Sequence, residues 1–186
     1  MMNKIVILFL VFIITGCIPK PIHQMNSYDL YVKSSTIKSV FRNNKVLKVK
    51  FPIALGTLNS SRIFYKKDGI TSYYLYNRWS SSLNRLIYRD ILVSLQNNKK
   101  YKNVVSYSSS SKVDLYLEIE IIDFYHVVTK YNSYAKININ VKFIDANNNN
   151  IIKSRTFEFK KYLESANAKS FVKGAKEALI ELIENL

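Results

Sequence analysis

Two stretches of this chain alternate strictly between apolar and polar residues. In residues 113–121 the odd positions are Val, Leu, Leu, Ile and Ile, and the even positions are Asp, Tyr, Glu and Glu. Residues 134–143 repeat the pattern, with Ala, Ile, Ile, Val and Phe on one face and Lys, Asn, Asn and Lys on the other. A period of two predicts β-strands with one face in a core and one in water. If the two strands are antiparallel neighbours, the acidic outer face of the first meets the basic outer face of the second.

Shorter strands are predicted on both sides of this pair. Their residues are 28–31, 45–51, 101–107 and 151–160. A hairpin is predicted where residues 63–65 and 72–76 flank the sequence Lys-Lys-Asp-Gly, because Asp68 and Gly69 readily adopt the positive φ angles of a tight turn.

The period changes to that of a helix in two segments. Apolar residues fall at helical spacing in residues 80–97, and Ser80 or Ser81 can cap the start. Residues 168–186 carry one apolar stripe, and acidic residues dominate the last turns, which favours packing on a sheet over lying on a membrane. The order of strands and helices predicts an α+β fold, with an antiparallel or mixed sheet and two main helices packed on one face.

The first seventeen residues, MMNKIVILFLVFIITGC, predict a cleaved leader. The apolar run of residues 5–14 covers about half of a ~30 Å hydrocarbon core, so it is too short for a spanning helix. A basic residue, Lys4, precedes it and small residues follow it, as in a signal peptide. The only cysteine of the chain, Cys17, comes next. An ordinary secretory signal with a chance cysteine, or a buried apolar strand, are the competing interpretations.

Ile14-Thr15-Gly16-Cys17 resembles the lipobox of bacterial lipoproteins. The resemblance implies cleavage after Gly16, diacylglycerol on the Cys17 thiol and acylation of the new amine. Several acyl chains would anchor the protein stably, at about 0.8 kcal/mol per buried CH₂. We therefore predict a signal peptide over residues 1–16, a lipidated cysteine and tether over 17–26, and a single periplasmic α+β domain over 27–186. Fully extended, residues 18–26 reach about 30 Å.

The formal net charge of +15 suggests an anionic partner. Because an export signal argues against nucleic acid, anionic lipid or an acidic protein remains. The basic residues are spread along a chain rich in Lys, Asn, Ile and Tyr, so a compositional origin without a specific ligand is the competing interpretation.

No catalytic, metal-binding or cofactor-binding motif is found in the sequence. His23 lies in the tether and His126 follows a strand, and neither has the spacing of a metal site. Asp114, Glu118 and Glu120 share one strand face, where acid–base chemistry is conceivable but a solvated sheet surface is favoured. We therefore predict no catalytic residues, no metal and no cofactor, and a protein that is not an enzyme.

The aromatic segment before the first helix, Tyr-Tyr-Leu-Tyr-Asn-Arg-Trp at residues 73–79, is the candidate partner interface. Aromatic residues beside arginine are frequent anchors of protein interfaces, and arginine can stack on tryptophan. The predicted interface residues are Tyr74, Tyr76, Arg78 and Trp79. For Trp79 a core position at the start of the helix is the favoured alternative, and for the tyrosines the two interpretations are balanced.

Several short motifs follow one another in a familiar order. After the lipobox come Tyr28-Asp29-Leu30, the strand that ends at Pro52, Ile63-Phe64-Tyr65, Tyr76-Asn77-Arg78-Trp79 and a closing amphipathic helix. Over about residues 17–185 this resembles the ABC-type transport auxiliary lipoproteins, the PqiC/YmbA-like group. The family usually continues after Arg-Trp with Ala and Pro, where this chain has three serines.

The resemblance implies a non-enzymatic partner of an MCE-domain protein in lipid transport between the membranes. It also implies a lipid anchor at the periplasmic face of the outer membrane, which is consistent with isoleucine rather than aspartate after Cys17. Homo-oligomerisation is left open. The alternative function is a free-standing envelope lipoprotein that binds anionic lipid or another envelope ligand.

Overall fold

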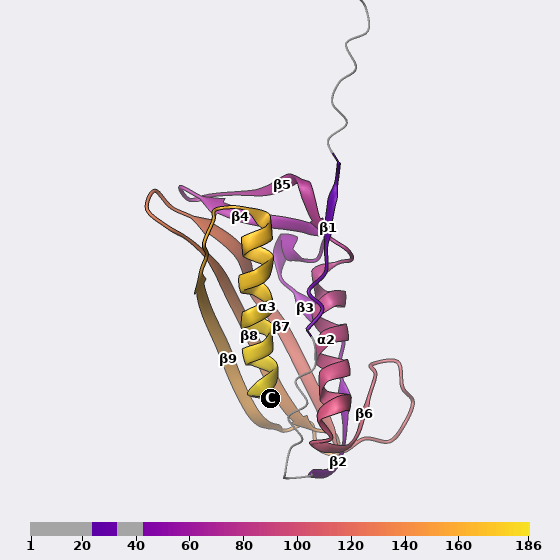
Figure 1. Ribbon diagram of the computed structural model, residues 1–186. Coiled ribbons are helices and arrows are strands. Elements are labelled where there is room, and N and C mark those ends of the chain that lie inside the picture. Colours follow the sequence, from indigo (N-terminus) through magenta and orange to yellow (C-terminus); the bar gives the residue numbers. More distant parts are fainter. Residues whose placement is uncertain (1–23, 33–42) are drawn as a thin grey trace, which may run out of the picture.

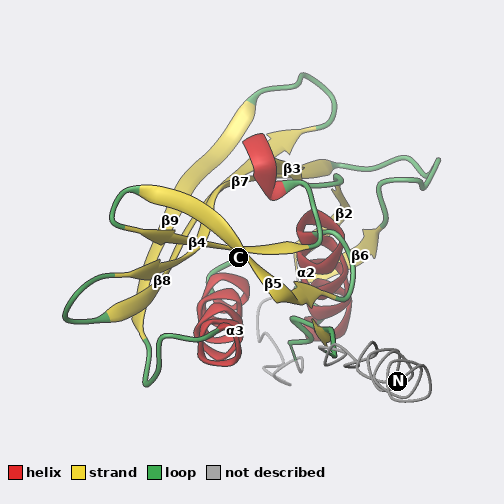
Figure 2. Ribbon diagram, turned by 90° about the horizontal axis from the view of Figure 1, so that it is seen from above, coloured by secondary structure: helices red, strands yellow, loops and turns green. Residues whose placement is uncertain are grey.

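The computed structural model describes residues 24–32 and 43–186, which form a mixed β-sheet with two α-helices on one face (Figure 1). The view from above shows both helices on the same side of the curved sheet (Figure 2). The predicted α+β class is confirmed. No helix within these two described ranges has the length and hydropathy that a membrane crossing requires.

The sheet has nine strands, and a short 3₁₀ turn, η1 (Gly56–Leu58), follows the third. The strands are β1 (Asn26–Tyr28), β2 (Asn43–Val49), β3 (Ile53–Ala54), β4 (Arg62–Lys67), β5 (Ile70–Trp79), β6 (Tyr101–Val105), β7 (Leu115–Val128), β8 (Ser133–Asp145) and β9 (Ile151–Tyr162). The helices are α2 (Leu83–Asn98) and α3 (Ala168–Glu184).

The long strand β7 organises the sheet. Its whole length pairs antiparallel with β8, which in turn pairs antiparallel with β9. Its other edge is shared in succession by β2, β3 and β4, all parallel to it. One strand therefore joins the β2–β6 pair at one end of the molecule to the β4–β5 hairpin at the other (Figure 1).

The predicted alternation in β7 and β8 is confirmed, but β7 is longer than predicted. The odd residues from Leu115 to Ile121 are buried. The register then shifts at a bulge around Ile122, because Ile121 pairs with Ile139 while Asp123 pairs with Asn138. Beyond this bulge the even-numbered residues of β7 point into the core.

The predicted hairpin is also confirmed. Asp68 and Gly69 have φ angles of 50° and 79°, as a two-residue turn of the I′ type requires. Strand β5 runs on to Trp79, so α2 begins at Leu83 with Ser82 at its N-cap. The prediction of Ser80 or Ser81 as the cap was wrong, because these residues follow a longer strand.

The strand predicted at residues 28–31 is displaced towards the N-terminus. Strand β1 ends at Tyr28, where it pairs in parallel with Trp79 of β5. The chain then leaves the sheet because the Asp29 carboxylate accepts hydrogen bonds from Arg89 of α2.

Helix α3 buries its predicted apolar stripe against β8 and β9. Its Phe171 and Ala175 are fully buried. At Gly174 the helix comes so close to the end of β9 that an added Cβ would stand 2.7 Å from Cδ2 of Leu163. Helix α2 covers β6 and β3, so one core lies between the sheet and both helices.

Candidate functional site

The aromatic segment of β5 divides into a buried and an exposed part. Trp79 is only 2 % exposed, and its ring contacts Phe124 of β7 and Phe171 of α3 at centroid distances of 5.9 and 6.0 Å. Its backbone N–H donates to the Ser61 carbonyl at 2.8 Å. Trp79 is therefore a core residue, and the structure corrects its inclusion among the surface residues of the candidate interface.

Tyr74 lies between the surface and the core. Its Oη is 2.5 Å from Nδ1 of His126, and its ring lies 5.1 Å from that of Tyr65. Burial, and then the neighbouring Tyr65, raise the pKa of Tyr74 to about 12. Tyr74 therefore stays protonated and fixes the imidazole rather than presenting its hydroxyl to a partner.

His126 is fully buried on the core side of β7, beyond the bulge. Its ring stacks between Tyr74 and Phe171, and within the described residues Nε2 has no hydrogen-bond partner. Burial lowers the pKa of His126 to about 4, so the imidazole is neutral at physiological pH. The interpretation of His126 as a structural histidine agrees with this position.

Tyr76 and Arg78 remain at the surface. The Tyr76 side chain is 44 % exposed, and Arg78 is exposed as well. Arg78 lies opposite Ser27 of β1 on one side and Arg62 of β4 on the other. The surface pair thus borders β1, the first strand after the predicted tether.

The residues after β1 are held to α2 by a charged cluster that the sequence analysis missed. The Arg89 guanidinium donates to both carboxylate oxygens of Asp29, one of them at 3.0 Å, and to Asp90 at 2.8 Å. Asp90 is buried and also accepts the backbone N–H of Val32 at 3.3 Å. Hydrogen bonding to Arg89 lowers the pKa of Asp29, whereas burial raises that of Asp90. In the sequence, the adjacent residues Arg89 and Asp90 were the available signal for this cluster, but no local pattern indicates that Asp29 contacts them.

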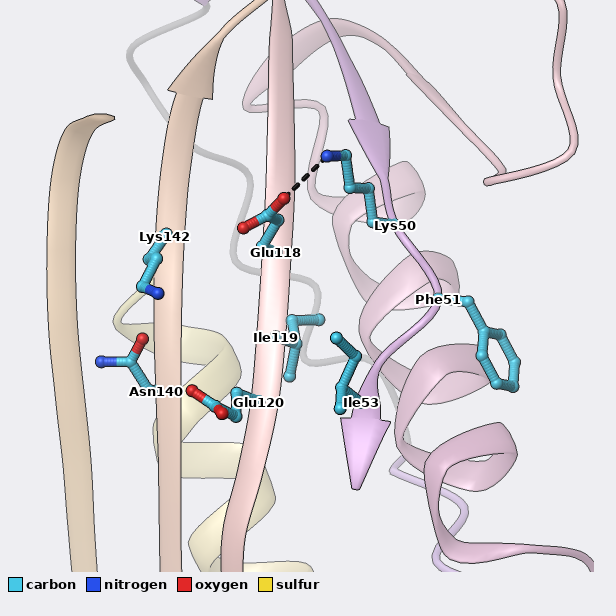
Figure 3. A pocket seen from close by; sticks show the side chains of 8 residues that line it. All are labelled: Lys50, Phe51, Ile53, Glu118, Ile119, Glu120, Asn140 and Lys142. Carbon is cyan, nitrogen blue, oxygen red and sulfur yellow. Dashed lines mark hydrogen bonds and ion pairs between the residues drawn. The ribbon is translucent and has the colours of Figure 1, made fainter. Parts of the chain in front are cut away.

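A pocket of about 190 Å³ lies on the face of the sheet away from the helices (Figure 3). Lys50 reaches across its rim and binds Oε1 of Glu118 at 2.7 Å. Glu120 and Asn140, which are opposite each other on β7 and β8, line the floor, with Lys142 beside them.

Two of the three carboxylates of the first alternating strand, Asp114 and Glu118, have separate structural partners. Glu118 pairs with Lys50, and Asp114 accepts the backbone N–H of Val46 at 2.7 Å. Among the described residues no group of three His, Cys, Asp or Glu side chains is placed to hold a metal ion. The pocket is thus a mixed-charge depression whose acidic groups are spread along the sheet.

The predicted lipidation site, Cys17, and the cleavage position after Gly16 lie outside the described residues, as does His23. The first described residue is Gln24, which leads directly into β1.

The geometry described so far is that of an α+β sheet with two helices on one face, and a comparison with protein families identifies the class of protein to which the chain belongs. The model of the family described as the ABC-type transport auxiliary lipoprotein component matches residues 28–186. The chain belongs to this family. A search of curated proteins finds no match.

Solved structures with the same fold include protein XCC0632 of Xanthomonas campestris. That match has 18 % identity and a TM-score of 0.76, and covers 86 % of this chain and 91 % of the other. The hypothetical protein CT253 of Chlamydia trachomatis matches at 10 % identity and a TM-score of 0.54, over 77 % of this chain and 95 % of the other. At these identities the matches show the fold alone.

Family membership makes the protein an auxiliary, envelope-associated lipoprotein component of an ABC-type transport system. This family is not a known enzyme class.

Proposed function

We propose that the protein is the non-enzymatic, lipid-anchored subunit of an ABC transporter complex that contains an MCE-domain protein and moves lipid between the membranes. The observation that carries this proposal is the family match over residues 28–186, which spans the whole described domain except the first residues of β1. The anchor holds the protein at the periplasmic face of the outer membrane.

The anchoring half of the proposal rests on the order of elements at the N-terminus. The lipobox cysteine is followed by a short tether, and the tether leads into β1. Beyond β1, the bonds of Arg89 to Asp29 and Asp90 fasten the chain to α2. A pull on the anchor is thereby transmitted to the folded domain.

Acyl labelling tests the anchor. Wild-type protein is expected to incorporate fatty acid and to sediment with outer membranes, and Cys17→Ser is expected to lose both properties. A Cys17→Ser variant that is labelled like the wild type would refute the anchor.

The partner-binding half rests on the exposed pair beside β1. Tyr76 and Arg78 combine an aromatic ring with a guanidinium, and the neighbouring Trp79 packs into the core and fixes the end of β5. Such a pair on a well-packed strand suits an interface anchor, because tyrosine and arginine are enriched among the residues that dominate binding energy.

Photo-crosslinking from position 76 in the native envelope, followed by mass spectrometry, identifies the partner. We expect an MCE-domain protein. Arg78→Ala is expected to weaken co-purification about tenfold or more without changing the unfolding midpoint. Arg85→Ala, an exposed arginine of α2, is the matched control and is expected to bind normally. Equal binding by both variants would show that the interface lies elsewhere.

A further inference from the structure

Three ends of the sheet converge at one corner of the molecule. In the β4–β5 hairpin Lys67 pairs with Ile70, and on its other side it pairs with Val128, the last residue of β7. The turn between β7 and β8 therefore lies beside the β4–β5 turn. At the start of β8, Tyr134 pairs with Tyr162, so the end of β9 joins the same corner (Figure 1).

The side chains at this corner are apolar or aromatic residues interleaved with lysines. Ile70 is 69 % exposed, Tyr131 85 % and Tyr162 65 %. The lysines are also exposed, and each lies on one of the three strand ends. Together the six residues form what we call the tip surface: Lys67, Ile70, Lys130, Tyr131, Lys160 and Tyr162.

The positive charge of the tip surface is only partly compensated. Asp68 lies beside it, in the turn between Lys67 and Ile70, and Glu164, just beyond β9, is bound to Lys173 at 2.8 Å. Lys130 lies over the ring of Tyr131, and Lys160 lies over that of Tyr162. These lysines are held by aromatic rings rather than by carboxylates, so their charge remains available to an anion.

Strand β1, which follows the predicted tether in the sequence, begins at the same end of the molecule. Strand β1 pairs in parallel with residues 77–79 of β5, so the described chain enters β1 beside Asn77. In Figure 1 the start of β1 and the two hairpin tips lie in the upper part of the molecule, on opposite sides of it. From Cys17 to Gln24 the chain spans at most about 25 Å.

We infer that the tip surface docks on the anionic bilayer to which the lipid anchor attaches. The inference rests on the anchor of the proposed function, although not on its transporter partner. Tyrosine favours the headgroup level of a bilayer, and lysines near the surface are attracted to anionic lipid. Ile70, exposed at the β4–β5 turn, then reaches the acyl boundary. Contacts at three strand ends would orient the domain, whereas a tether alone leaves it free to rotate.

A bilayer fits this surface better than a folded protein does. The three strand ends project separately, and a flat fluid surface can meet all three without a complementary shape. The opposite end of the molecule, around the start of β7, also has exposed lysines, so overall charge does not single out the tips. They are Lys45 of β2, Lys102 of β6 and Lys112 in the loop before β7. The tips are distinguished by their interleaved aromatic residues and by the start of β1 at the same end of the molecule.

The matched lysines at the two ends provide the first test. The mature chain from residue 17, carrying Cys17→Ser and hence no lipid, is sedimented with vesicles of phosphatidylglycerol and phosphatidylcholine. The triple variant Lys67→Gln/Lys130→Gln/Lys160→Gln is expected to lose about fivefold in partitioning per lysine, on the order of 100-fold in all. The control Lys45→Gln/Lys102→Gln/Lys112→Gln, with the same net charge, is expected to bind like the wild type. Equal losses in both triple variants would overturn the inference, as would a lack of vesicle binding by the wild type.

A probe of depth provides the second test. In the Cys17→Ser background an environment-sensitive fluorophore is attached at Tyr131→Cys, or at Asn148→Cys in the turn between β8 and β9 at the opposite end. Vesicles are expected to shift emission to the blue at position 131 and leave it unchanged at 148, and lipid-borne quenchers are expected to act on position 131 alone.

Equal responses at the two positions would overturn the inference, as would crosslinking of position 131 to a protein in native envelopes. Trp79 fluorescence and circular dichroism confirm that each variant is folded. Because neither vesicle assay uses the anchor or the transporter, failure of the proposed function leaves both results interpretable. An absence of acyl labelling or of an MCE partner would be detected only in the labelling and crosslinking experiments that test the proposed function.

Discussion

Adjacent residues of a strand point to opposite faces, so Arg78 reaches the surface while Trp79 enters the core. Trp79→Ala removes a ring packed between Phe124 and Phe171 and is expected to destabilise the protein by about 3–5 kcal/mol. Arg78→Ala is expected to change the free energy of unfolding by less than about 0.5 kcal/mol. Urea unfolding followed by circular dichroism measures both.

This pair of variants separates folding from partner binding. Loss of co-purification by Trp79→Ala alone would report unfolding, whereas loss by Arg78→Ala reports the interface. A large destabilisation by Arg78→Ala would contradict its surface position.

His126 makes stability depend on pH. Its pKa is about 4 in the folded protein against 6.5 for an ordinary histidine. Between these values the unfolded chain holds a proton that the folded protein does not, so stability rises with pH. The contribution of His126 is complete above pH 6.5 and is lost as the pH falls towards 4, by up to about 3 kcal/mol.

His126→Gln is expected to flatten this dependence in urea titrations between pH 7 and 4. Tyr74→Phe keeps the buried imidazole and serves as control, with the pH dependence retained. If His126→Gln kept the wild-type slope, another group would be responsible.

At the residue scale the local sequence does not distinguish a buried tyrosine from an exposed one. Tyr74 was therefore assigned to the candidate interface because it lies near an arginine in the sequence. The contact that fixes Tyr74 comes from His126, 52 residues away. Such a partner is brought close only by the pairing of β4 with β7.

At the scale of elements, the Arg89 cluster joins the segment after β1 to α2. Arg89→Ala leaves the buried Asp90 carboxylate without its cation and is expected to destabilise the protein by about 1–3 kcal/mol, since Arg89 and Asp29 are themselves partly exposed. Backbone amides of residues 30–32 are expected to exchange faster with deuterium, because Val32 donates to Asp90.

The control for this element is an ion pair that lies in water. Lys173 and Glu164 are 64 % and 80 % exposed, so Lys173→Ala is expected to leave the unfolding midpoint almost unchanged. Equal effects of the two substitutions, or unchanged exchange at residues 30–32 in Arg89→Ala, would argue against a fastening role.

Elements with a strong local signal were predictable from the sequence, as the Asp68-Gly69 hairpin and the alternation in β8 show. The second half of β7 was not. Ile121 and Ile122 are both apolar, which hides the bulge where the phase of burial inverts. The two-residue strand β3 was missed because its pairing with β7 is tertiary rather than local.

At the scale of the whole molecule, distant segments of the described chain share a hydrophobic core. Phe171 of α3 meets Trp79 at the end of β5 and both Phe124 and His126 of β7. Because β7 runs through the sheet from end to end, a loss of packing at one end of the sheet would expose apolar residues at the other end. The prediction of a single domain over residues 27–186 therefore implies that these segments unfold together.

Phe171→Ala tests that cooperativity. Truncating the ring is expected to destabilise the protein by about 3–5 kcal/mol, which the wild type tolerates if its stability lies in the usual range. Trp79 fluorescence reports the shared core, and far-ultraviolet circular dichroism reports the sheet and helices. In a single cooperative unit both signals move to the same lower urea midpoint. If Trp79 fluorescence changed at lower urea than circular dichroism, the region around β5 and α3 would unfold on its own, and the tether would be attached to a separate folding unit.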